Sequence, residues 1–269
     1  MLQIDGQVSE TLLISLYMRY RESKAANPII HDPSALQLVP QMDYDFSKLD
    51  KAIHSQVGTA LRARYFDDLT RAFIAKNPQP VVIQLACGLD HRAARLGDTS
   101  TPFVLLDLPE VIELRRRLLP PQANETLISA SAFDKDWIEP LRAQFPNHQF
   151  IIVIEGLVMY FPKEQLRTLL VHLAQGFPAG TEIAFDVTGS LAIKMNGHHD
   201  AVKYSRATFQ LVCDDDREME GWAPNLQFLE VKTYTDFPEF RRAGWLSFHI
   251  MRLIRPLRRA FRLLHYRIN

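Results

Sequence analysis

Short apolar runs alternate with longer stretches of mixed polarity through the middle of the chain. Strands that are apolar throughout are buried on both faces, which is typical of a parallel sheet covered by helices on each side. The intervening stretches, such as PEVIELRRRLL and KEQLRTLLVHLAQGF, have the length and the apolar spacing of helices. The pattern therefore predicts a doubly wound α/β fold. The expected strands are VVIQL (81–85), FVLLD (103–107), TLIS (126–129), FIIVIE (150–155) and TEIAFD (181–186).

The two ends of the chain have different patterns. Apolar positions recur at helical spacing in residues 11–26 and 47–76, and a linker that contains Pro and Asp joins these two stretches. Residues 190–225 are polar and irregular, so we interpret them as a lid or insertion. The expected parts are an N-terminal helical cap (1–76), a ligand-binding core (77–189), the lid or substrate insertion (190–225) and closing strands of the core, QFLEVKTYTD and FRLLHYRI (226–269).

Composition narrows the class of protein. Lys plus Arg and Asp plus Glu each number 31, so no net charge attracts nucleic acid. Cys87 and Cys213 are too few to staple a chain of this size and do not form a zinc motif, so we expect no metal and a reducing, cytoplasmic setting. The stretch MLQIDGQVSE has no basic start followed by an apolar run, so we expect no signal peptide, and no apolar segment reaches the ~18 residues of a membrane span. The number of subunits does not follow from composition.

Acidic residues and a glycine follow the predicted strands. The first strand runs into the turn Ala-Cys-Gly at 86–88, the second ends at Asp107, the fourth ends at Glu155, and Asp134 comes soon after the third. In doubly wound sheets, ligands lie beyond the carboxyl ends of the strands. Asp107 lies 19 residues beyond Gly88, close to the ~20 expected for a carboxylate that binds ribose hydroxyls. The ligand is therefore expected to contain a nucleoside.

The glycine content of the turn separates two classes of nucleoside cofactor. A dinucleotide presses its pyrophosphate against backbone N–H groups and requires three glycines in G-x-G-x-x-G, whereas ACGLDH has one. S-adenosylmethionine has no phosphate and carries a sulfonium, an amino acid head and an adenosine, so it needs more carboxylates and less exposed backbone. The turn favours S-adenosylmethionine; a nicotinamide oxidoreductase is the alternative, and cofactor-binding measurements would separate the two.

Several motifs follow one another in order along the chain. They are TLLISLYMRYRES, DYDFSKL, LRARYFDD, LACGLDHRAARL, LLDLPEVIELRRRLLP, ISASAFDKDW and IEGLVMYFPKEQL. Together they resemble the leucine carboxyl methyltransferase family, especially its bacterial branch in polyketide synthesis, over roughly residues 10–240. The resemblance implies a Rossmann-like methyltransferase that uses S-adenosylmethionine to methylate oxygen, often that of a carboxylate.

The resemblance also implies roles for individual residues. Gly88 would lie against the methionine part of the cofactor, and Asp107 would bind the ribose hydroxyls. Asp134 would accept a hydrogen bond from the adenine amino group, and Glu155 would face the methionine amino group.

An arginine in LRARYFDD would pair with the cofactor carboxylate, because a guanidinium binds a carboxylate bidentately. Arg62 is preferred to Arg64 for this role. Ala86 occupies the place of the family's usual first glycine, where its methyl group would crowd the cofactor or shift its head.

The acceptor determines whether a base is needed. A carboxylic acid, with a pKa near 4, is ionised at neutral pH and needs only capture and desolvation, whereas a phenol needs a base such as His91, His198 or His199. We expect a small carboxylic acid, with a phenol as the alternative. A catalytically idle module that binds the cofactor is a further alternative. Candidate residues lining the acceptor site are Tyr17, Arg19, Tyr160, Lys194 and Tyr204.

Simpler structural roles compete with these assignments. Asp107 could cap the helix that follows it, Asp134 could form a turn, and Cys87 could be a small buried side chain. The Arg and Lys clusters are expected to be solvated helix faces. Residues 251–269 carry six arginines and no acid. We favour a terminal strand with basic flanks there over a helix lying on an anionic membrane, so membrane contact is not expected.

Overall fold

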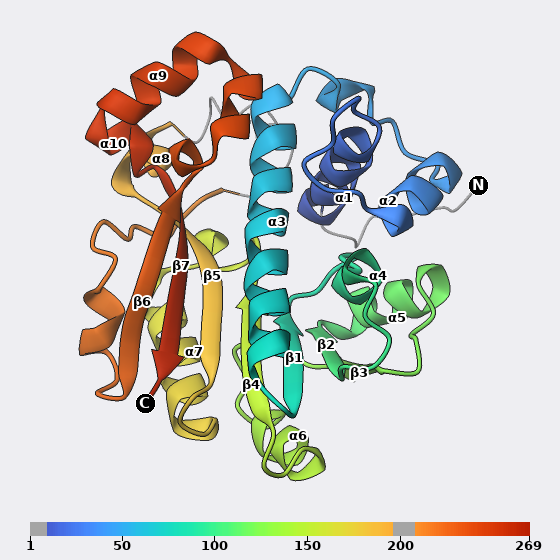
Figure 1. Cartoon of the computed structure of the whole chain (residues 1–269), viewed down its shortest axis with the longest axis vertical. Coiled ribbons are helices and arrows are strands. Elements are labelled where there is room, and N and C mark those ends of the chain that lie inside the picture. Colours follow the sequence, from blue (N-terminus) through green and yellow to red (C-terminus); the bar gives the residue numbers. More distant parts are fainter. Residues whose placement is uncertain (1–9, 196–207) are drawn as a thin grey trace.

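The computed structural model describes residues 10–195 and 208–269. The described residues form one seven-stranded mixed sheet with helices on both faces (Figure 1). The strand order is β3-β2-β1-β4-β5-β7-β6. The strands are β1 Pro80–Leu85, β2 Phe103–Asp107, β3 Glu125–Ser129, β4 Gln149–Ile154, β5 Glu182–Thr188, β6 Leu226–Thr233 and β7 Phe261–Ile268.

The first five strands confirm the predicted parallel sheet. β1 pairs in parallel with β2 on one side and with β4 on the other. The strand order therefore reverses between β1 and β4, and the carboxyl ends of these two strands border the crevice where doubly wound sheets bind ligands. The residues singled out at strand ends all lie at this edge or in the loops that leave it.

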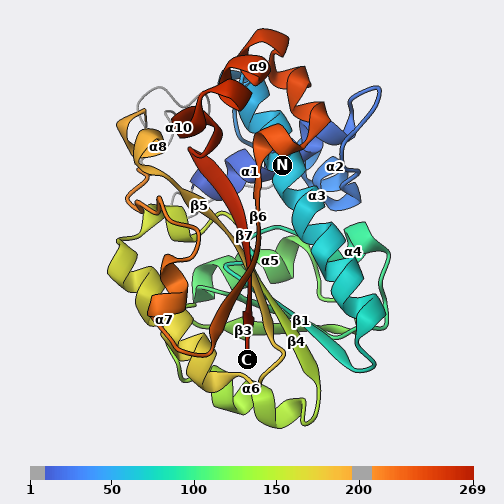
Figure 2. The same ribbon diagram turned by 60° about the vertical axis from the view of Figure 1, so that its left-hand side comes forward.

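The two closing strands are also confirmed, and they make the sheet mixed. β7 lies between β5 and β6 and is antiparallel to both. Its residues Leu263, Leu264 and Tyr266 are fully buried. Figure 2 shows β5, β6 and β7 crossing the molecule together.

Alternation along the parallel strands builds two apolar layers, because successive side chains point to opposite faces. Val81 and Ile83 join one cluster, whereas Val82, between them, joins the other. The first cluster contains α6 and α7; the second contains side chains of α3, α4 and α5. The longer helices are α1 Glu10–Ser23, α3 Ile53–Lys76, α5 Pro109–Leu118, α7 Lys163–Gly176 and α9 Trp245–Leu253, and the shorter ones are α2 Pro33–Leu38, α4 Arg92–Leu96, α6 Ile138–Gln144, α8 Ser190–Lys194 and α10 Arg255–Arg258.

Helix α3 connects the N-terminal region to the sheet. Phe66 and Phe73, in its second half, pack on the sheet with Val82. Helices α1 and α2 form a separate cluster that also contains Leu89 and Leu114, from the turn after β1 and from α5. The N-terminal helices therefore cover the turn that follows β1 (Figure 1).

The segment interpreted as a lid returns to the same edge of the sheet. The N–H groups of Gln210 and Leu211 donate to the carbonyl of Met159, and the N–H of Cys213 donates to Thr188 at the end of β5. A short 3-10 helix, η6 Glu218–Gly221, then leads toward β6. The candidates Tyr204, His198 and His199 lie outside the described residues.

The expectation for the C-terminal stretch needs a correction. Its last part is the strand β7, as predicted, but the basic residues before it are helical, in α9 and α10. The arginines at 252, 255 and 258 therefore project from short helices and not from flanks of a strand. Among the described residues, no helix combines the length and the apolar composition needed to cross a bilayer.

Candidate functional site

The turn after β1 adopts a left-handed backbone at two positions. Gly88 has φ 50° and Ala86 has φ 53°. This region suits glycine, whereas an L-residue with a Cβ atom pays about 1–2 kcal/mol there. Ala86, which stands where the family resemblance leads one to expect a glycine, therefore occupies a strained position of the backbone.

Asp107 holds the turn in place. Its Oδ2 accepts a hydrogen bond from the N–H of Gly88 at 2.7 Å, and its Oδ1 accepts one from the N–H of Leu108 at 2.8 Å. Leu108 is the N-cap of α5 and no side chain caps that helix, so Asp107 is not the helix cap that the sequence allowed. Burial raises the pKa of Asp107, and the two backbone bonds oppose that shift. Each carboxylate oxygen keeps a lone pair that a ligand hydroxyl could use.

Arg62 lies between two carboxylates. Its Nε donates to Glu155 at 3.0 Å, and one terminal nitrogen donates to Asp186 at 2.9 Å. All three side chains are at least 88% buried, because their exposed fractions are 12%, 12% and 4%. Burial alone would lower the pKa of Arg62, but Asp186 and Glu155 outweigh it and raise the pKa. For Asp186, burial is the larger effect and raises the pKa.

Gly156 allows this close packing. Its φ is 70°, its N–H donates to Asp186 at 2.7 Å, and a Cβ atom there would lie 3.1 Å from a terminal nitrogen of Arg62. A side chain would thus be strained and would crowd the guanidinium. This explains the glycine after Glu155 in the motif IEGLVMY.

The structure distinguishes the two arginines of LRARYFDD. Arg64 points to the outside of α3 and forms a bidentate pair with Glu239, at 2.7 and 3.2 Å. Arg62 instead reaches the carboxyl edge of the sheet, beside Glu155. The geometry favours Arg62 for a role in cofactor binding.

The arginines of α4 are buried, which corrects the expectation that the Arg clusters are solvated helix faces. Arg92 donates to Asp67 at 2.5 Å and to Glu155 at 2.8 Å. Arg95 donates to Asp67 at 2.6 Å and to Asp90 at 2.6 Å. Burial would raise the pKa of Asp90, but the charges of Arg95, Arg92 and Arg19 outweigh burial and lower it well below its usual range. This buried ion-pair network links α3 and α4 to the Glu155 side of the site.

Arg115 of α5 is buried and binds backbone carbonyl groups of the turn after β1. One terminal nitrogen donates to the carbonyl of Gly88 at 3.0 Å and to that of Asp90 at 2.6 Å. This arginine occurs in the run PEVIELRRRLL, and its neighbours Arg116 and Arg117 are exposed. Helical spacing, which turns one of three consecutive arginines inward, is the sequence signal that could have identified it.

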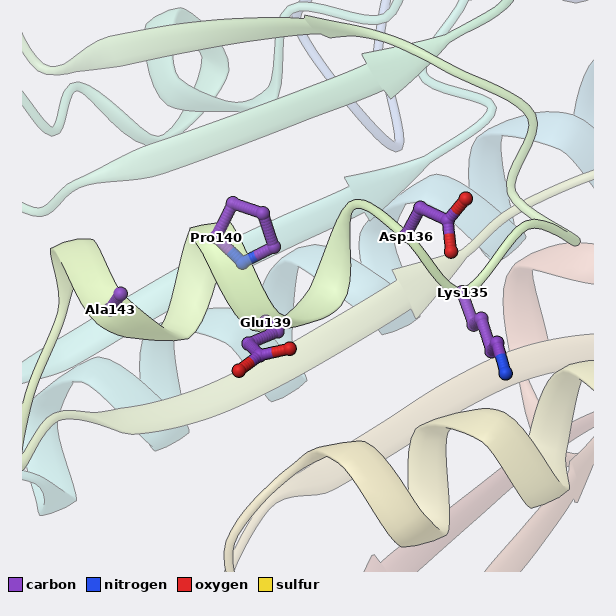
Figure 3. Close-up of a pocket in the computed structure, with 5 residues that line it drawn as sticks. All are labelled: Lys135, Asp136, Glu139, Pro140 and Ala143. Carbon is purple, nitrogen blue, oxygen red and sulfur yellow. The ribbon is translucent and has the colours of Figure 1, made fainter.

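Asp134 lies in an exposed turn, and its N–H donates to the carbonyl of Ser131. A hollow of about 490 Å³ begins just after it, lined by Lys135, Asp136, Glu139, Pro140 and Ala143. Figure 3 shows these side chains spread along α6 and the loop before it. The hollow shares no residue with the Gly88, Asp107 and Glu155 site, so we assign it no role in cofactor binding.

An aromatic row borders the Arg62 pair. Tyr160 stacks on Phe209 at 5.5 Å, Phe209 contacts Phe261 at 5.6 Å, and Phe261 contacts Tyr234 at 6.5 Å, all measured between ring centroids. Burial raises the pKa of Tyr160 to about 12, and the charge of Arg62 opposes that shift. Neither Tyr160 nor Tyr234, whose pKa burial also raises, is ionised near neutral pH. We call these four side chains the aromatic row.

The other acceptor-lining candidates lie elsewhere. The Tyr17 hydroxyl donates to Asp50 at 2.5 Å, and its ring stacks on Phe46 within the N-terminal helical region. Arg19 is 3% exposed and donates to Asp32 at 2.7 Å, so its guanidinium is committed to the ion-pair network. Lys194 is exposed on α8. Of the described candidates, only Tyr160 adjoins the Arg62 pair.

His91 and Cys87 have structural environments. His91 is buried, its Nδ1 lies 2.8 Å from the Ser34 hydroxyl, and its Nε2 lies 3.2 Å from Glu125. Cys87 is buried, and burial raises the pKa of its thiol to about 12. Within residues 10–195 and 208–269, no cluster of His, Cys, Asp or Glu side chains could hold a metal ion.

Asp186 is the main site residue that the sequence analysis did not select. It lies inside β5, two residues before the strand ends, and is 3% exposed. Asp186 closes the predicted strand TEIAFD, and a carboxylate there requires a partner, since burying an unpaired charge is costly. Its position at the predicted strand end, like those of Asp107 and Glu155, was the available signal.

Comparison with known proteins gives consistent matches. The model of the leucine carboxyl methyltransferase family matches residues 13–174. The tetracenomycin polyketide synthesis O-methyltransferase TcmP of Streptomyces glaucescens is 32% identical over 264 residues, which cover 96% of each chain. The S-adenosyl-L-methionine-dependent methyltransferase dpfgK of Gibberella zeae is 28% identical over 264 residues, which cover 91% of this chain and 88% of the relative.

Solved structures with low sequence identity share the fold. A DUF574 family protein from Streptomyces avermitilis has a TM-score of 0.58 at 15% identity and covers 98% of this chain and 99% of its own. The magnesium protoporphyrin IX methyltransferase ChlM from Synechocystis PCC 6803, solved with bound SAH, has a TM-score of 0.50 at 12% identity and covers 94% of each chain. At these identities the likeness concerns the Rossmann-like architecture alone.

Proposed function

The chain belongs to the leucine carboxyl methyltransferase family and is an S-adenosylmethionine-dependent methyltransferase, and from that premise we propose that it methylates a carboxylate oxygen of a small molecule such as a polyketide-type acid. The similarity to TcmP, an O-methyltransferase of tetracenomycin polyketide synthesis, supports oxygen as the acceptor atom. The observation that carries the proposal is the position of the buried Arg62 beside Glu155, at the carboxyl edge of the sheet, next to two phenols that stay protonated.

The residues at this edge fit S-adenosylmethionine. Asp107 has lone pairs left for two ribose hydroxyls after its bonds to Gly88 and Leu108. Glu155 offers a carboxylate to an amino group. Arg62 uses Nε and one terminal nitrogen for Glu155 and Asp186, and its second terminal nitrogen has no hydrogen-bond partner among the described residues, so it is available to a carboxylate. Asp134, exposed in its turn, is the proposed acceptor for the adenine amino group.

When bound, S-adenosylmethionine supplies an electrophilic methyl group on a sulfonium. The residues of this chain would orient that group and exclude water from it. Displacement requires the acceptor oxygen in line with the leaving sulfur, so positioning supplies much of the rate enhancement. The aromatic row offers a largely apolar surface near Arg62, which suits an aromatic acid and would remove water from its carboxylate.

The acid–base chemistry favours a carboxylate over a phenol as the acceptor. A carboxylate is already ionised at neutral pH and gives up no proton. A phenol must lose its proton to a base, and the described groups near Arg62 are poorly placed for this. Tyr160 and Tyr234 are protonated, and both oxygens of Asp186 and of Glu155 accept internal hydrogen bonds.

Methyl transfer from labelled S-adenosylmethionine to matched acceptors tests the proposal. Aromatic carboxylic acids would be compared with phenols of the same ring system. Mild alkali hydrolyses a methyl ester and releases labelled methanol, but it leaves an aryl methyl ether intact. We expect alkali-labile product from the acids. Alkali-stable product formed from the phenols alone would overturn the carboxylate assignment and leave a phenol O-methyltransferase.

A pair of arginine variants on one helix serves as the internal control. Arg62→Gln should reduce product formation, whereas Arg64→Gln removes the same charge from the outer side of α3 and should retain it. Equal loss in both variants would argue against a specific role of Arg62.

A further inference from the structure

Helix α9 and the residue after it expose an apolar face. Helical spacing places Leu246, Ile250 and Leu253 on one side of the helix, with Trp245 beside them. The exposed fractions are 67% for Trp245, 64% for Leu246, 42% for Ile250, 85% for Leu253 and 46% for Ile254. We call these five residues the α9 face.

The α9 face is not the side that attaches the helix to the protein. Phe248, on the opposite side, is 1% exposed and packs in a cluster with Val57, Leu61 and Phe240. The helix is therefore apolar both toward the core and toward solvent. A surface helix normally turns a polar face outward, and a contiguous exposed apolar patch indicates something that covers it.

Positive charge surrounds the α9 face. Residues 243–269 contain six arginines and no Asp or Glu. Arg259 and Arg262 turn inward and pair with Asp216. Arg252, Arg255 and Arg258 are exposed, and within the described residues none of these three has an ion-pair partner. Three guanidinium groups next to five apolar side chains are complementary to an anionic apolar interface.

The α9 face lies at the substrate end of the molecule. Helices α9 and α10 cover the end at which β5 and β6 finish (Figure 1). The chain then enters β7 at Phe261, which is a member of the aromatic row. A surface that binds the α9 face would therefore lie beside the mouth of the proposed site.

We propose that the α9 face and the three free arginines dock this protein on the surface of an anionic lipid bilayer. Trp and Leu side chains would enter the headgroup region, with arginines contacting lipid phosphates. Arginine suits this role because its planar guanidinium binds phosphate bidentately. A lipid surface fits the charge pattern better than a second copy of this chain, because the same arginines of two copies would face one another across a twofold interface. The inference does not depend on which acceptor is methylated.

Sedimentation of the full chain with lipid vesicles tests the proposal. We expect binding to vesicles of equal parts phosphatidylcholine and phosphatidylglycerol, and little binding to phosphatidylcholine alone. Binding should weaken when the salt concentration rises from about 0.05 M to about 0.5 M, because salt screens the arginines. The double variant Leu246→Gln/Leu253→Gln should bind anionic vesicles about tenfold more weakly. Both side chains are exposed, so this variant should fold.

Matched controls separate docking through the α9 face from nonspecific adsorption to vesicles. Ile53→Gln removes an apolar side chain exposed on another helix, and Arg116→Gln removes an exposed arginine of α5; both should bind like the wild type. Tryptophan fluorescence gives an independent readout. Of the three tryptophans, Trp245 is 67% exposed, Trp137 is 6% exposed and Trp222 is half-buried against the core. Anionic vesicles should therefore shift the emission of Trp245 to the blue, and Trp245→Phe should abolish the shift.

Three outcomes would overturn the proposal. The first is the absence of binding to anionic vesicles, and the second is equal binding by the wild type and the Leu246→Gln/Leu253→Gln variant. The third is a concentration-dependent dimer, without vesicle binding, that the same variant dissolves, since that result assigns the α9 face to a second copy of the chain.

Discussion

The backbone N–H of Gly88 donates a 2.7 Å hydrogen bond to the carboxylate of Asp107. This bond joins the turn after β1 to the end of β2, so the carboxylate that would bind ribose also fixes the backbone against which the cofactor would lie. We therefore expect turn geometry and cofactor binding to be coupled through this side chain.

Replacement of this carboxylate should weaken cofactor binding. In Asp107→Ala, loss of two charge-assisted hydrogen bonds should reduce affinity for S-adenosylhomocysteine by roughly ten- to a hundredfold. Isothermal titration calorimetry measures the change. Glu110→Ala removes an exposed acid from the same segment and should leave affinity unchanged. Unaltered affinity in Asp107→Ala would restrict Asp107 to holding the turn.

The two arginines of α3 should differ in their effect on stability. Arg62→Gln leaves Asp186 buried without its cation and Glu155 with Arg92 alone, and should cost about 3–5 kcal/mol of unfolding free energy. Arg64→Gln breaks a pair with Glu239 that is partly exposed and should cost about 0–1 kcal/mol. Urea denaturation measures both. A similar cost for the two variants would show that the buried pair is not specially stabilising.

The strained turn should respond to a glycine. Ala86→Gly relieves the left-handed strain but adds freedom to the unfolded chain, so we expect a net gain of about 0.5–1 kcal/mol in unfolding free energy. Cofactor affinity should also rise, because the methyl group is removed from the turn. Asn147→Gly is the matched control: it has φ 64° in the loop between α6 and β4 and should leave affinity unchanged. A lower unfolding free energy of Ala86→Gly would contradict the inference that the backbone is strained at residue 86.

The buried network predicts a pH dependence of stability. Although burial opposes ionisation, Arg95, Arg92 and Arg19 lower the pKa of Asp90 well below its usual 3.8. A carboxyl whose pKa is lower in the folded state stabilises the fold above the unfolded pKa and loses this contribution as pH falls through the folded pKa. The destabilisation by Asp90→Asn should therefore be largest above about pH 5 and should shrink as pH falls below 3.8.

Urea unfolding of the wild type and Asp90→Asn across this range measures the effect. Asp68→Asn, which breaks an exposed pair with Arg71, should show little effect at any pH. A difference between wild type and Asp90→Asn that does not change with pH would contradict the lowered pKa.

The rate of methyl transfer should be nearly flat between about pH 6 and 8, because a carboxylate acceptor is ionised throughout that range. Tyr160, with its pKa raised to about 12 by burial, takes up or releases no proton there. Single-turnover measurements at saturating cofactor test this. A steep rise of the rate with pH that a His→Ala variant at 91, 198 or 199 abolishes would instead indicate a phenol acceptor that the histidine deprotonates.

Local patterns in the sequence predicted most of the strands and helices of the fold. The buried strands were readable because each is apolar throughout and bounded by a helix-length stretch. Helix α9 was missed because WLSFHIMRL is apolar on almost every side, so the sequence has no clear polar face to mark it. Its packing against Val57 and Leu61, which are distant in sequence, defines the helix.

The site residues at strand ends could be predicted from the sequence. The buried ion pairs between residues far apart in the chain could not. The spacing of Gly88 and Asp107 suggested a shared ligand, and the two residues prove to be in contact. Burial of Arg92 depends on Asp67, 25 residues earlier and on another helix, so its own helix alone indicated a solvated residue. Asp186 closes the predicted strand TEIAFD but was not selected, and its role depends on Arg62, which lies 124 residues earlier on another element.

The position of β7 between β5 and β6 sets the order in which a nascent chain can complete the sheet. β5 leaves the ribosome long before β7, and β6, which is synthesised between them, forms no ladder with β5. Until β7 emerges, the fully buried strand Glu182–Thr188 has an open edge. Such edges pair readily with other chains. We therefore expect the unfinished chain to be prone to wrong strand pairing while residues 189–260 are synthesised, and translation speed across them should influence the yield of correctly folded protein.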